Sequence, residues 1–314
     1  IEFPITNGVF GNLHYGILLF TALMLWAFTF KAALFPNHFW LPDAHAAAPT
    51  PVSALLSGLV VKIGVYAIAR FIYTIYGVSW INQLSTQVIL ILGFISAYIG
   101  AILMIIQSDL KKFIACSTIL NIGYIGVGPG IGTSLGLAAS TYHIVNHAIS
   151  KALLFLSAGL LIKIVGSRNI ASLQGLGRRY PVIGIPFAIA LLSLAGIPPL
   201  NIFMSKFLLY MALIGSNNIP LALILLIPSI ISFTAYTRIF YTICIKPPLE
   251  SNRNIGHSLL NIPSSIPIYL LAITCILLGI GIDYILPSII MPASNILANT
   301  SIYINTVLNY MKMI

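Results

Sequence analysis

Long apolar runs separated by short polar stretches dominate the pattern of this chain. Each of the eight longest runs could cross a membrane, since a helix needs about 20 residues to span the hydrocarbon. The runs are continuous, whereas the strands of a membrane β-barrel would alternate over about ten residues. The pattern predicts an all-α polytopic membrane protein with about eight transmembrane helices. The predicted crossings are 13–47, 50–76, 86–107, 109–130, 132–163, 181–214, 219–245 and 264–287.

Prolines interrupt two of these runs near mid-depth. The first run is interrupted at Pro36, and the sixth at Pro198 and Pro199 within the sequence GIPPL. Proline lacks a backbone donor and frees a carbonyl in the preceding turn, so a break inside a membrane needs other polar partners. Paired breaks often mark ion sites in transporters, and the alternative for each break is a packing kink. We predict that both helices are broken at mid-membrane.

Composition agrees with a membrane protein, because 59% of the residues are hydrophobic and only 6% are charged. The net charge of +10 would suggest nucleic acid as the partner of a soluble chain. Here the basic residues lie mostly in three short loops, which are 108–112, 163–180 and 246–258. The intervening loops without lysine or arginine are 77–85, 128–134 and 215–220. The positive-inside rule then predicts basic loops on the cytoplasmic or matrix side, both termini opposite, and no role for nucleic acid.

No soluble domain or linker is predicted, so residues 1–314 form one transmembrane domain with an interfacial tail from 289. The cysteines Cys116, Cys244 and Cys275 match no metal or disulfide spacing and are expected to be small buried hydrophobes. No motif for haem, flavin or iron–sulfur is found, so we expect neither a cofactor nor a metal on this chain. The opening IEFPITNGVF lacks Met, a basic region and a cleavage site, and is not a signal peptide. A fragment, a processed product and a split gene product all remain open.

Four lysines fall near the middle of predicted crossings: Lys31, Lys62, Lys151 and Lys206. A lysine at the centre of a membrane helix costs about 2.5–3.5 kcal/mol on insertion scales. Snorkelling to the interface is the alternative explanation, and it fits basic residues near helix ends. It does not fit Lys62, which lies at the centre of the run 50–76. Because intramembrane charges are functional by default, we expect these lysines to serve function.

The fifth run, STYHIVNHAISKALLFLSAG, places His143, His147 and Lys151 at positions i, i+4 and i+8. Four residues turn a helix by about 400°, so the three side chains share one stripe and climb about 12 Å. Histidine titrates near neutral pH and a desolvated lysine can lose its proton, so the stripe can relay protons through bridging waters. Haem and zinc ligation are alternatives, but no further ligand lies near in sequence. Either histidine alone could also be a satisfied core residue.

Carboxylates are scarce in the predicted crossings. Asp43 follows FWLP near the end of the first crossing, and Asp109 begins a helix, where capping is its simplest role. No carboxylate lies at mid-membrane to pair with Lys31 or Lys62. A buried lysine without a counter-ion is either neutral or paired with a group on another chain.

Four segments in order resemble the antiporter-like subunits of respiratory complex I, of multi-subunit cation/proton antiporters and of membrane-bound energy-converting hydrogenases. They are FKAALFPNHFWLPDAHAAAPTPVSALLSGLVVKIGVY, DLKKFIACSTILNIGY, YHIVNHAISKALLFLSAG and SLAGIPPLNIFMSKF. The resemblance covers most of 16–215, while 219–314 match only in hydropathy. It implies two inverted five-helix half-channels around a hydrated axis, with proton transfer driven by redox chemistry elsewhere in the complex.

The resemblance also implies residue roles. Lys31 matches the broken-helix lysine of the first half-channel, and Lys62 matches the connecting lysine on the next helix. Lys206 matches the terminal residue of the second half-channel. The central relay is matched by His143, His147 and Lys151. His38 and Asp43 fall in the same run, with weaker roles.

Family members have more helices than this chain, so the resemblance implies that only part of a subunit is present. Residues 13–76 would hold the tail of the first half-channel and the connection, 86–245 the second half-channel, and 264–314 the C-terminal helix and tail. The glutamate that pairs with Lys31 would lie in the missing front portion.

We therefore expect a proton-translocating subunit, or a split half of one, in a prokaryotic cytoplasmic or mitochondrial inner membrane. The expected partners are lipids, other membrane subunits including homologous antiporter-like ones, and a separate chain with the missing N-terminal helices. The alternatives are a secondary cation/proton antiporter subunit and a structural membrane module without its own channel. The chain itself shows no catalytic or redox site, so whether it belongs to an enzyme complex is left open.

Overall fold

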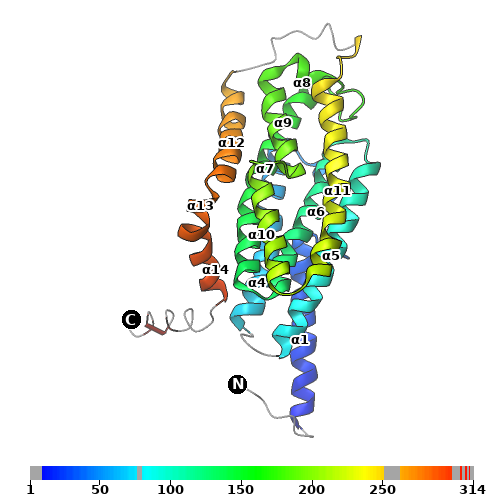
Figure 1. Ribbon diagram of the computed structural model, residues 1–314. Coiled ribbons are helices and arrows are strands. Elements are labelled where there is room, and N and C mark those ends of the chain that lie inside the picture. The colour runs from blue at the N-terminus through cyan, green and yellow to red at the C-terminus, as the bar shows by residue number, and fades with distance from the viewer. Residues whose placement is uncertain are drawn as a thin grey trace.

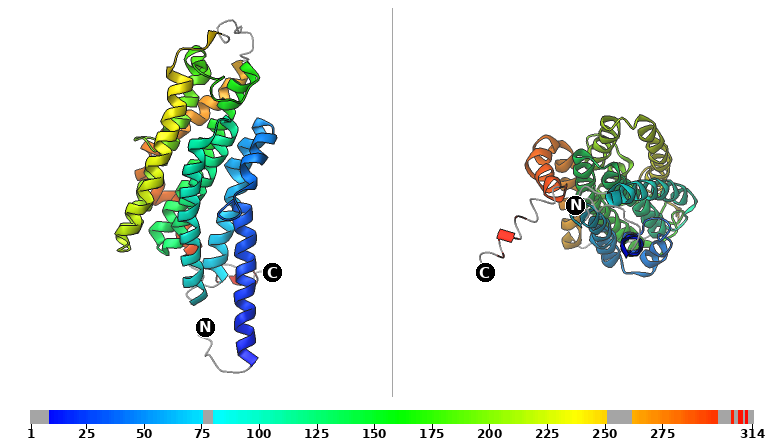
Figure 2. Two further views of the ribbon diagram at one scale, coloured as in Figure 1. Left: turned by 90° about the vertical axis from the view of Figure 1, so that its right-hand side faces the viewer. Right: turned by 90° about the horizontal axis from the view of Figure 1, so that it is seen from below.

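A computed structural model describes residues 9–75, 80–250 and 262–298, together with isolated helical positions beyond. The described chain contains helices and no strands, and the helices lie side by side in an elongated bundle (Figures 1 and 2). This architecture confirms the predicted all-α polytopic membrane protein. Residues 1–8, 76–79 and 251–261, the last of which include most of the basic loop 246–258, lie outside the described residues, as does most of the predicted tail 289–314 beyond residue 298.

The helices follow one another with short connections. The first part of the chain forms α1 (Val9–Ala32), α2 (Trp40–Ala47), α3 (Thr50–Leu55), the π-helical turn η1 (Leu56–Val60), α4 (Val61–Arg70), the π-helical turn η2 (Phe71–Ile75), α5 (Trp80–Ile106), α6 (Leu110–Ile131) and α7 (Ser134–Val165). The second part forms α8 (Leu176–Arg179), α9 (Pro181–Ala195), α10 (Asn201–Gly215), α11 (Ile219–Phe240), η3 (Tyr241–Ile245), α12 (Ile262–Ile280), α13 (Ile282–Ile285), η6 (Leu286–Ile290) and α14 (Met291–Ala298).

Fewer helices than predicted are long and apolar enough to cross a membrane. In the described residues there are six, or seven if the bent pair formed by α12 and α13–α14 counts as one span. The predicted number of eight is too high by this measure. The sixth predicted crossing is divided into α9 and α10, and each has 15 residues, which is short for a single span. The six spans are Tyr15–Ala32, Thr50–Thr74, Ile81–Ile106, Leu110–Ile131, Ser134–Val165 and Ile219–Ile245.

The first predicted break is present between α1 and α2. The chain leaves the helix at Ala33, which has a φ of 53°, and passes through a cis peptide bond at Phe35–Pro36. Side chains take over the exposed backbone groups: Asn37 donates to the Trp26 carbonyl, and Ser96 of α5 accepts from the Phe35 N–H. The break therefore meets the requirement that a non-helical segment within a membrane be satisfied by protein.

The second predicted break separates α9 from α10. Gly196 ends α9 in the left-handed region, with a φ of 84°, and Pro198–Pro199 is cis. Asn201 begins α10, and its Oδ1 accepts from Ser193 Oγ and from the Ile202 N–H. Its side-chain amide donates to the Asn146 carbonyl while Asn146 donates to the Asn201 carbonyl, so the break is tied to α7.

A third break was not predicted. The sequence analysis treats 264–287 as one crossing, but Ser265–Ile280 and Ile282–Ala298 meet at an angle of 72°. The break falls at Gly281, where no proline gives a signal. Glycine has no side chain to stabilise a helix, so a bend there is inexpensive.

The core is built around α6, whose most apolar window is 94% buried inside the bundle. Helices α5 and α6 approach so closely that glycine is required at the contact. A Cβ on Gly100 would lie 2.3 Å from the Leu120 nitrogen, and one on Gly123 would lie 2.5 Å from the Ala97 nitrogen. Small residues at such contacts are the usual means by which membrane helices associate.

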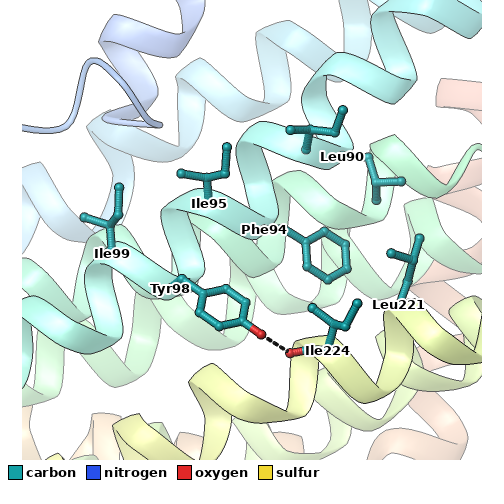
Figure 3. A pocket seen from close by; sticks show the side chains of 8 residues that line it. Leu90, Phe94, Ile95, Tyr98, Ile99, Leu221 and Ile224 are labelled. Carbon is teal, nitrogen blue, oxygen red and sulfur yellow. Dashed lines mark hydrogen bonds between the residues drawn. The ribbon is translucent and has the colours of Figure 1, made fainter.

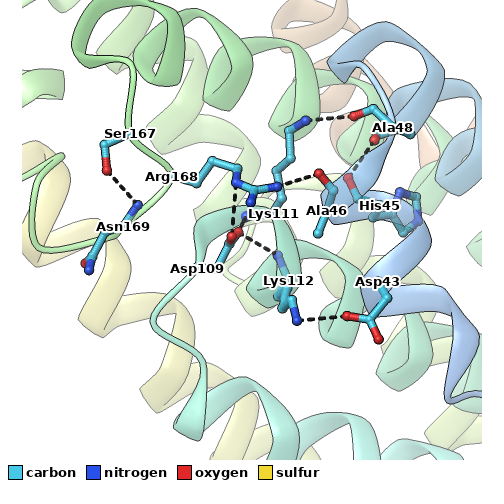
Figure 4. A network of polar contacts seen from close by, with 11 residues as sticks. Asp43, His45, Ala46, Ala48, Asp109, Lys111, Lys112, Ser167, Arg168 and Asn169 are labelled. Carbon is cyan, nitrogen blue, oxygen red and sulfur yellow. Dashed lines mark hydrogen bonds and ion pairs between the residues drawn. The ribbon is translucent and has the colours of Figure 1, made fainter.

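Two basic segments, 108–112 and 166–170, meet beside the end of α2 (Figure 4), and this end of the bundle is called the basic end. Asp109 caps α6 by accepting from the N–H groups of Lys111 and Lys112, as predicted, and it also pairs with Arg168 at 3.2 Å. Arg168 and Lys111 reach across to the carbonyls of the short α2 segment and its end, Ala46 and Ala48. Polar contacts thus join the 108–112 loop, the 166–170 loop and the end of α2.

Candidate functional site

A buried polar stripe runs along α7. His143, His147 and Lys151 are each 0% exposed, although their polar side chains would be better solvated in water. The imidazole rings of His143 and His147 are stacked, with centroids 6.0 Å apart and an interplanar angle of 7°. The three side chains share one face of one continuous helix, which is the arrangement that their spacing predicts.

Helix α6 faces this stripe with a second row of polar groups. Lys151 Nζ donates to the Ile114 carbonyl at 2.7 Å and to Ser117 Oγ. Asn121 donates to the Ser117 carbonyl at 2.7 Å, and its Oδ1 lies 3.2 Å from His143 Nε2. Ser117 and Asn121 therefore bridge Lys151 to His143, through protein groups alone.

The row continues from His143 onto α10. His143 Nδ1 lies 2.8 Å from Ser205 Oγ, and the next residue is Lys206. Lys206 is 5% exposed, and its Nζ lies over the ring of Tyr124 at 4.7 Å from the centroid, a cation–π contact. The same Nζ would lie 4.0 Å from a Cβ at Gly196, where α9 ends. The lysine therefore occupies the second helix break, near the negative end of the α9 dipole.

Lys62 joins the network from α4. It is 4% exposed, and its Nζ donates to the carbonyl of Ser57 in the π-helical turn η1. Ser57 Oγ lies 2.8 Å from Thr118 Oγ1, and Thr118 donates to the same Ile114 carbonyl that Lys151 binds. Lys62 and Lys151 thus belong to one connected set of hydrogen bonds across α6.

The other predicted site residues lie outside this set. Lys31 is in the last turn of α1, and its side chain is exposed, although the neighbouring Ala32 packs against Gly64 of α4. His38 lies in the first helix break and stacks on Phe35. Asp43 is at the basic end, with 78% of its side chain exposed, and pairs with Lys112 at 2.8 Å.

Several residues of the network were not singled out from the sequence. Ser117, Asn121 and Tyr124 are spaced i, i+4 and i+7 within DLKKFIACSTILNIGY, so they form one stripe on α6, and this spacing could have been noticed. Ser205 had no such signal, because its role depends on how α10 packs against α7. His45 was also missed; it is 0% exposed and stacks on Phe155 with centroids 4.8 Å apart.

Some buried nitrogens in this region have no hydrogen-bond partner among the described residues. They are both ring nitrogens of His147, both of His45, and Nζ of Lys206. Buried polar groups in native proteins are almost always paired with protein or water, so these nitrogens are candidate positions for exchanging a proton with water. Within the described chain, no three His, Cys, Asp or Glu side chains are grouped to hold a metal ion. Buried histidine and lysine side chains can each bind and release a proton, so this arrangement suits proton transfer.

An apolar groove of about 480 Å³ lies between α5 and α11, apart from this network (Figure 3). Its walls are aliphatic and aromatic side chains, including Leu90, Phe94 and Leu221. The one hydroxyl at its edge, that of Tyr98, donates to the Ile224 carbonyl at 2.7 Å. The groove therefore offers hydrophobic contact but no group for acid–base chemistry.

Known proteins share both the sequence and the geometry of this chain. The family described as NADH:quinone oxidoreductase/Mrp antiporter, transmembrane, matches residues 4–232. A Na⁺/H⁺ antiporter component of Alkalihalophilus pseudofirmus is 33% identical over 298 residues, which cover 93% of this chain and 59% of that relative. Among solved structures, a chain of the Mrp complex from a Dietzia species has a TM-score of 0.85 at 26% identity, covering 93% of this chain and 61% of that one. A chain of an archaeal respiratory complex, the membrane-bound sulfane sulfur reductase, has a TM-score of 0.83 at 28% identity, covering 91% of this chain and 57% of that one. The chain thus spans somewhat more than half the length of each of these three proteins.

Proposed function

The chain belongs to the NADH:quinone oxidoreductase/Mrp antiporter transmembrane family, and from that premise we propose that it translocates protons as an antiporter-like subunit, or part of one, of a larger membrane complex. One observation carries the proposal. Buried polar contacts link Lys62 and Lys151 through α6 to His143 and Ser205, and the next residue on α10 is Lys206, whose Nζ lies over the Tyr124 ring. Burying ionisable side chains in a membrane costs free energy, so such residues are rare there and usually serve a function.

In the proposed path, protons are taken up at the basic end and pass along Lys151, His147 and His143 to Lys206, which releases them at the opposite end. Charge on Lys62 biases this relay, because neighbouring like charges disfavour double protonation. Lys31 acts in the same way from the first helix break. Movement of one proton thereby alters the affinity of the next site for its own proton.

The proposal includes an arrangement in the membrane. Residues 86–245 form one half-channel, residues 13–76 the tail of the other and its connection, and residues 264–314 a C-terminal helix and tail. The basic loops face the cytoplasm or matrix, following the positive-inside rule, and both termini face the other side. A further polypeptide or segment supplies the rest of the first half-channel, since the relatives are longer than this chain. Other membrane subunits, homologous ones among them, and lipids surround it.

Two driving forces are compatible with this family. One relative is named as part of a Na⁺/H⁺ antiporter, and one structural neighbour belongs to a respiratory complex. We favour redox-driven translocation, because Na⁺ prefers hard oxygen ligands and no carboxylate of the described chain lies within the network. The alternative driving force is an ion gradient, which would drive cation/proton exchange. The remaining alternative function is a structural module without its own channel.

The proposal is tested with the complex purified through a tag on this chain and reconstituted in liposomes that contain a pH-sensitive dye. We expect Lys151→Met and Lys206→Met to lower proton translocation at least roughly tenfold, because each removes a proton carrier from the relay. Lys163→Met is the matched control, since Lys163 lies on α7 but its side chain is exposed at the basic end.

An electron donor and a Na⁺ pulse are compared as driving steps. A proton signal that needs the donor supports redox coupling, and a signal on the Na⁺ pulse alone supports exchange. Unchanged translocation in both lysine variants, with normal assembly, would leave only the structural role.

A further inference from the structure

Three tyrosine hydroxyls converge on the middle of α11. Pro228 has no N–H, so the Ile224 carbonyl one turn earlier lacks its helical partner, and Tyr98 of α5 donates to it at 2.7 Å (Figure 3). Tyr124 of α6 and Tyr210 of α10 donate to the next carbonyl, that of Leu225, at 3.0 and 3.3 Å. Hydroxyls from three neighbouring helices thus bind two adjacent carbonyls of α11, and Pro228 leaves the first of these carbonyls without its helical partner.

The contacts of Tyr124 and Tyr210 go beyond satisfying this carbonyl. Their hydroxyls also lie 2.7 and 2.9 Å from the same oxygen, Ser229 Oγ. Tyr124, Ser229 and Tyr210 thus form a chain of three hydroxyls, each of which can donate one proton and accept another. Tyr98 bonds the helix in the same way, but no contact links it to Ser229. Satisfying a helix carbonyl explains the single contact of Tyr98. It does not explain why Tyr124 and Tyr210 also contact Ser229 Oγ.

The hydroxyl chain begins next to Lys206. The Lys206 ammonium lies over the Tyr124 ring and has no hydrogen-bond partner among the described residues. Tyr210 follows Lys206 by four residues on the same face of α10, about 6 Å further along the helix. From Tyr210 to the end of α10 at Gly215 remain about 8 Å, followed by the polar turn 216–218. This turn lies at the end of the bundle opposite the basic loops.

We propose that Tyr124, Ser229 and Tyr210 form the release path that carries protons from Lys206 to the end opposite the basic loops; this rests on the proposed function. A proton leaves the Lys206 ammonium through a bridging water and binds a lone pair of the Tyr124 oxygen, whose own hydrogen turns from the Leu225 carbonyl to Ser229 Oγ and passes to it. Ser229 passes a proton to Tyr210 in the same way, and Tyr210 passes one to water near the 216–218 turn. Each hydroxyl gains one proton and loses one, so no tyrosinate, radical or net charge is left behind.

The test uses the reconstituted complex and compares hydroxyl-deleting variants with matched controls. Ser229→Ala and Tyr210→Phe are expected to reduce proton translocation per assembled complex about tenfold or more, in the range for loss of a proton-transfer group. Ser229→Thr keeps a hydroxyl and is expected to retain translocation. Tyr98→Phe is the control for the helix contact, because it removes a hydroxyl from the adjacent α11 carbonyl but not from the chain, and it is expected to translocate normally.

The outcomes are decisive in each direction. Normal translocation in Ser229→Ala or Tyr210→Phe overturns the release path, as does a loss in Tyr98→Phe as large as that in Tyr210→Phe, which would indicate a structural effect on α11. If Tyr210→Phe does not assemble, the comparison of alanine and threonine at half-buried Ser229 decides. Lys206→Met separates the two proposals: if it abolishes translocation while the hydroxyl variants do not, only the release path fails, and if it translocates normally the proposed function fails first.

Discussion

Asn121 is the bridge whose removal should be most informative. It is 0% exposed, donates to the Ser117 carbonyl at 2.7 Å and lies 3.2 Å from His143 Nε2. Asn121→Leu keeps a similar volume but removes both contacts. A buried hydrogen bond contributes about 0.5–1.5 kcal/mol net, and leaving the His143 nitrogen without a partner costs about 1–3 kcal/mol. We therefore expect a loss of about 1.5–4.5 kcal/mol in the free energy of unfolding.

The pairing itself is measured by a double-mutant cycle. His143→Leu alone leaves the Asn121 carbonyl oxygen unpaired, whereas the double variant leaves neither group unpaired across this contact. The two single costs should exceed the double cost by about 0.5–3 kcal/mol, the usual coupling for residues in direct contact. Costs that add within about 0.5 kcal/mol would refute the pairing of Asn121 with His143.

The chain provides its own reporter for this assay. Cys116 is 0% exposed and precedes Ser117 on α6, so its alkylation in a denaturant series reports the opening of this helix. Mass spectrometry of the Cys116 peptide distinguishes it from thiols of other subunits. Proton translocation by assembled Asn121→Leu should fall at least tenfold, which corresponds to about 1.4 kcal/mol in the barrier. Wild-type translocation in this variant would exclude Asn121 from the path.

Three further predictions concern the frame around the site. Gly100→Ala should reduce the amount of assembled protein, because its Cβ would lie 2.3 Å from the Leu120 nitrogen. Gly126→Ala is the control and should be tolerated, because the nearest atom to its Cβ would be 3.5 Å away. The amounts of assembled protein are compared on native gels. Asp109→Ala should lower stability by about 1 kcal/mol through loss of the α6 cap, and Asp109→Asn should restore most of it, as measured by Cys116 alkylation; equal losses would contradict the capping role. Asp43→Ala should leave translocation and stability unchanged within error, since its pair with Lys112 is solvent-exposed; a loss comparable to that of Lys151→Met would place Asp43 in the relay.

The pattern of the chain predicts most of the frame. Apolar length predicts the spans, GIPPL and Pro36 predict two breaks, and Asp109 before two lysines predicts a helix cap. The break at Gly281 was not predicted. A single glycine is a weak signal for a helix break, because the packing of α12 against α7 and α9 decides whether the helix bends at Gly281.

The site is predictable to a lesser degree. Burial of lysines in a membrane is expensive enough to mark Lys62, Lys151 and Lys206 from the sequence alone. The residues that connect these lysines cannot be recognised from the sequence, because serine, asparagine and tyrosine are common in membrane helices and burying them costs little free energy. Ser205 and Ser229 join the network only through the packing of α10 and α11 against their neighbours. Lys31 shows the limit in the other direction, since its position marked it as an intramembrane charge but its side chain is exposed at the end of α1.

The burial of α6 has a consequence for how the protein is made. Its most apolar window has a mean hydropathy of 1.4, the lowest of the six spans, whereas α5 reaches 2.7. Only three residues separate the two helices, and glycines let their backbones touch. During synthesis α6 should therefore enter the lipid poorly alone and leave the translocon as a hairpin with α5, its polar face shielded until α7 arrives. The most hydrophobic of the six described spans would thus act as the insertion partner of the helix that carries Ser117 and Asn121.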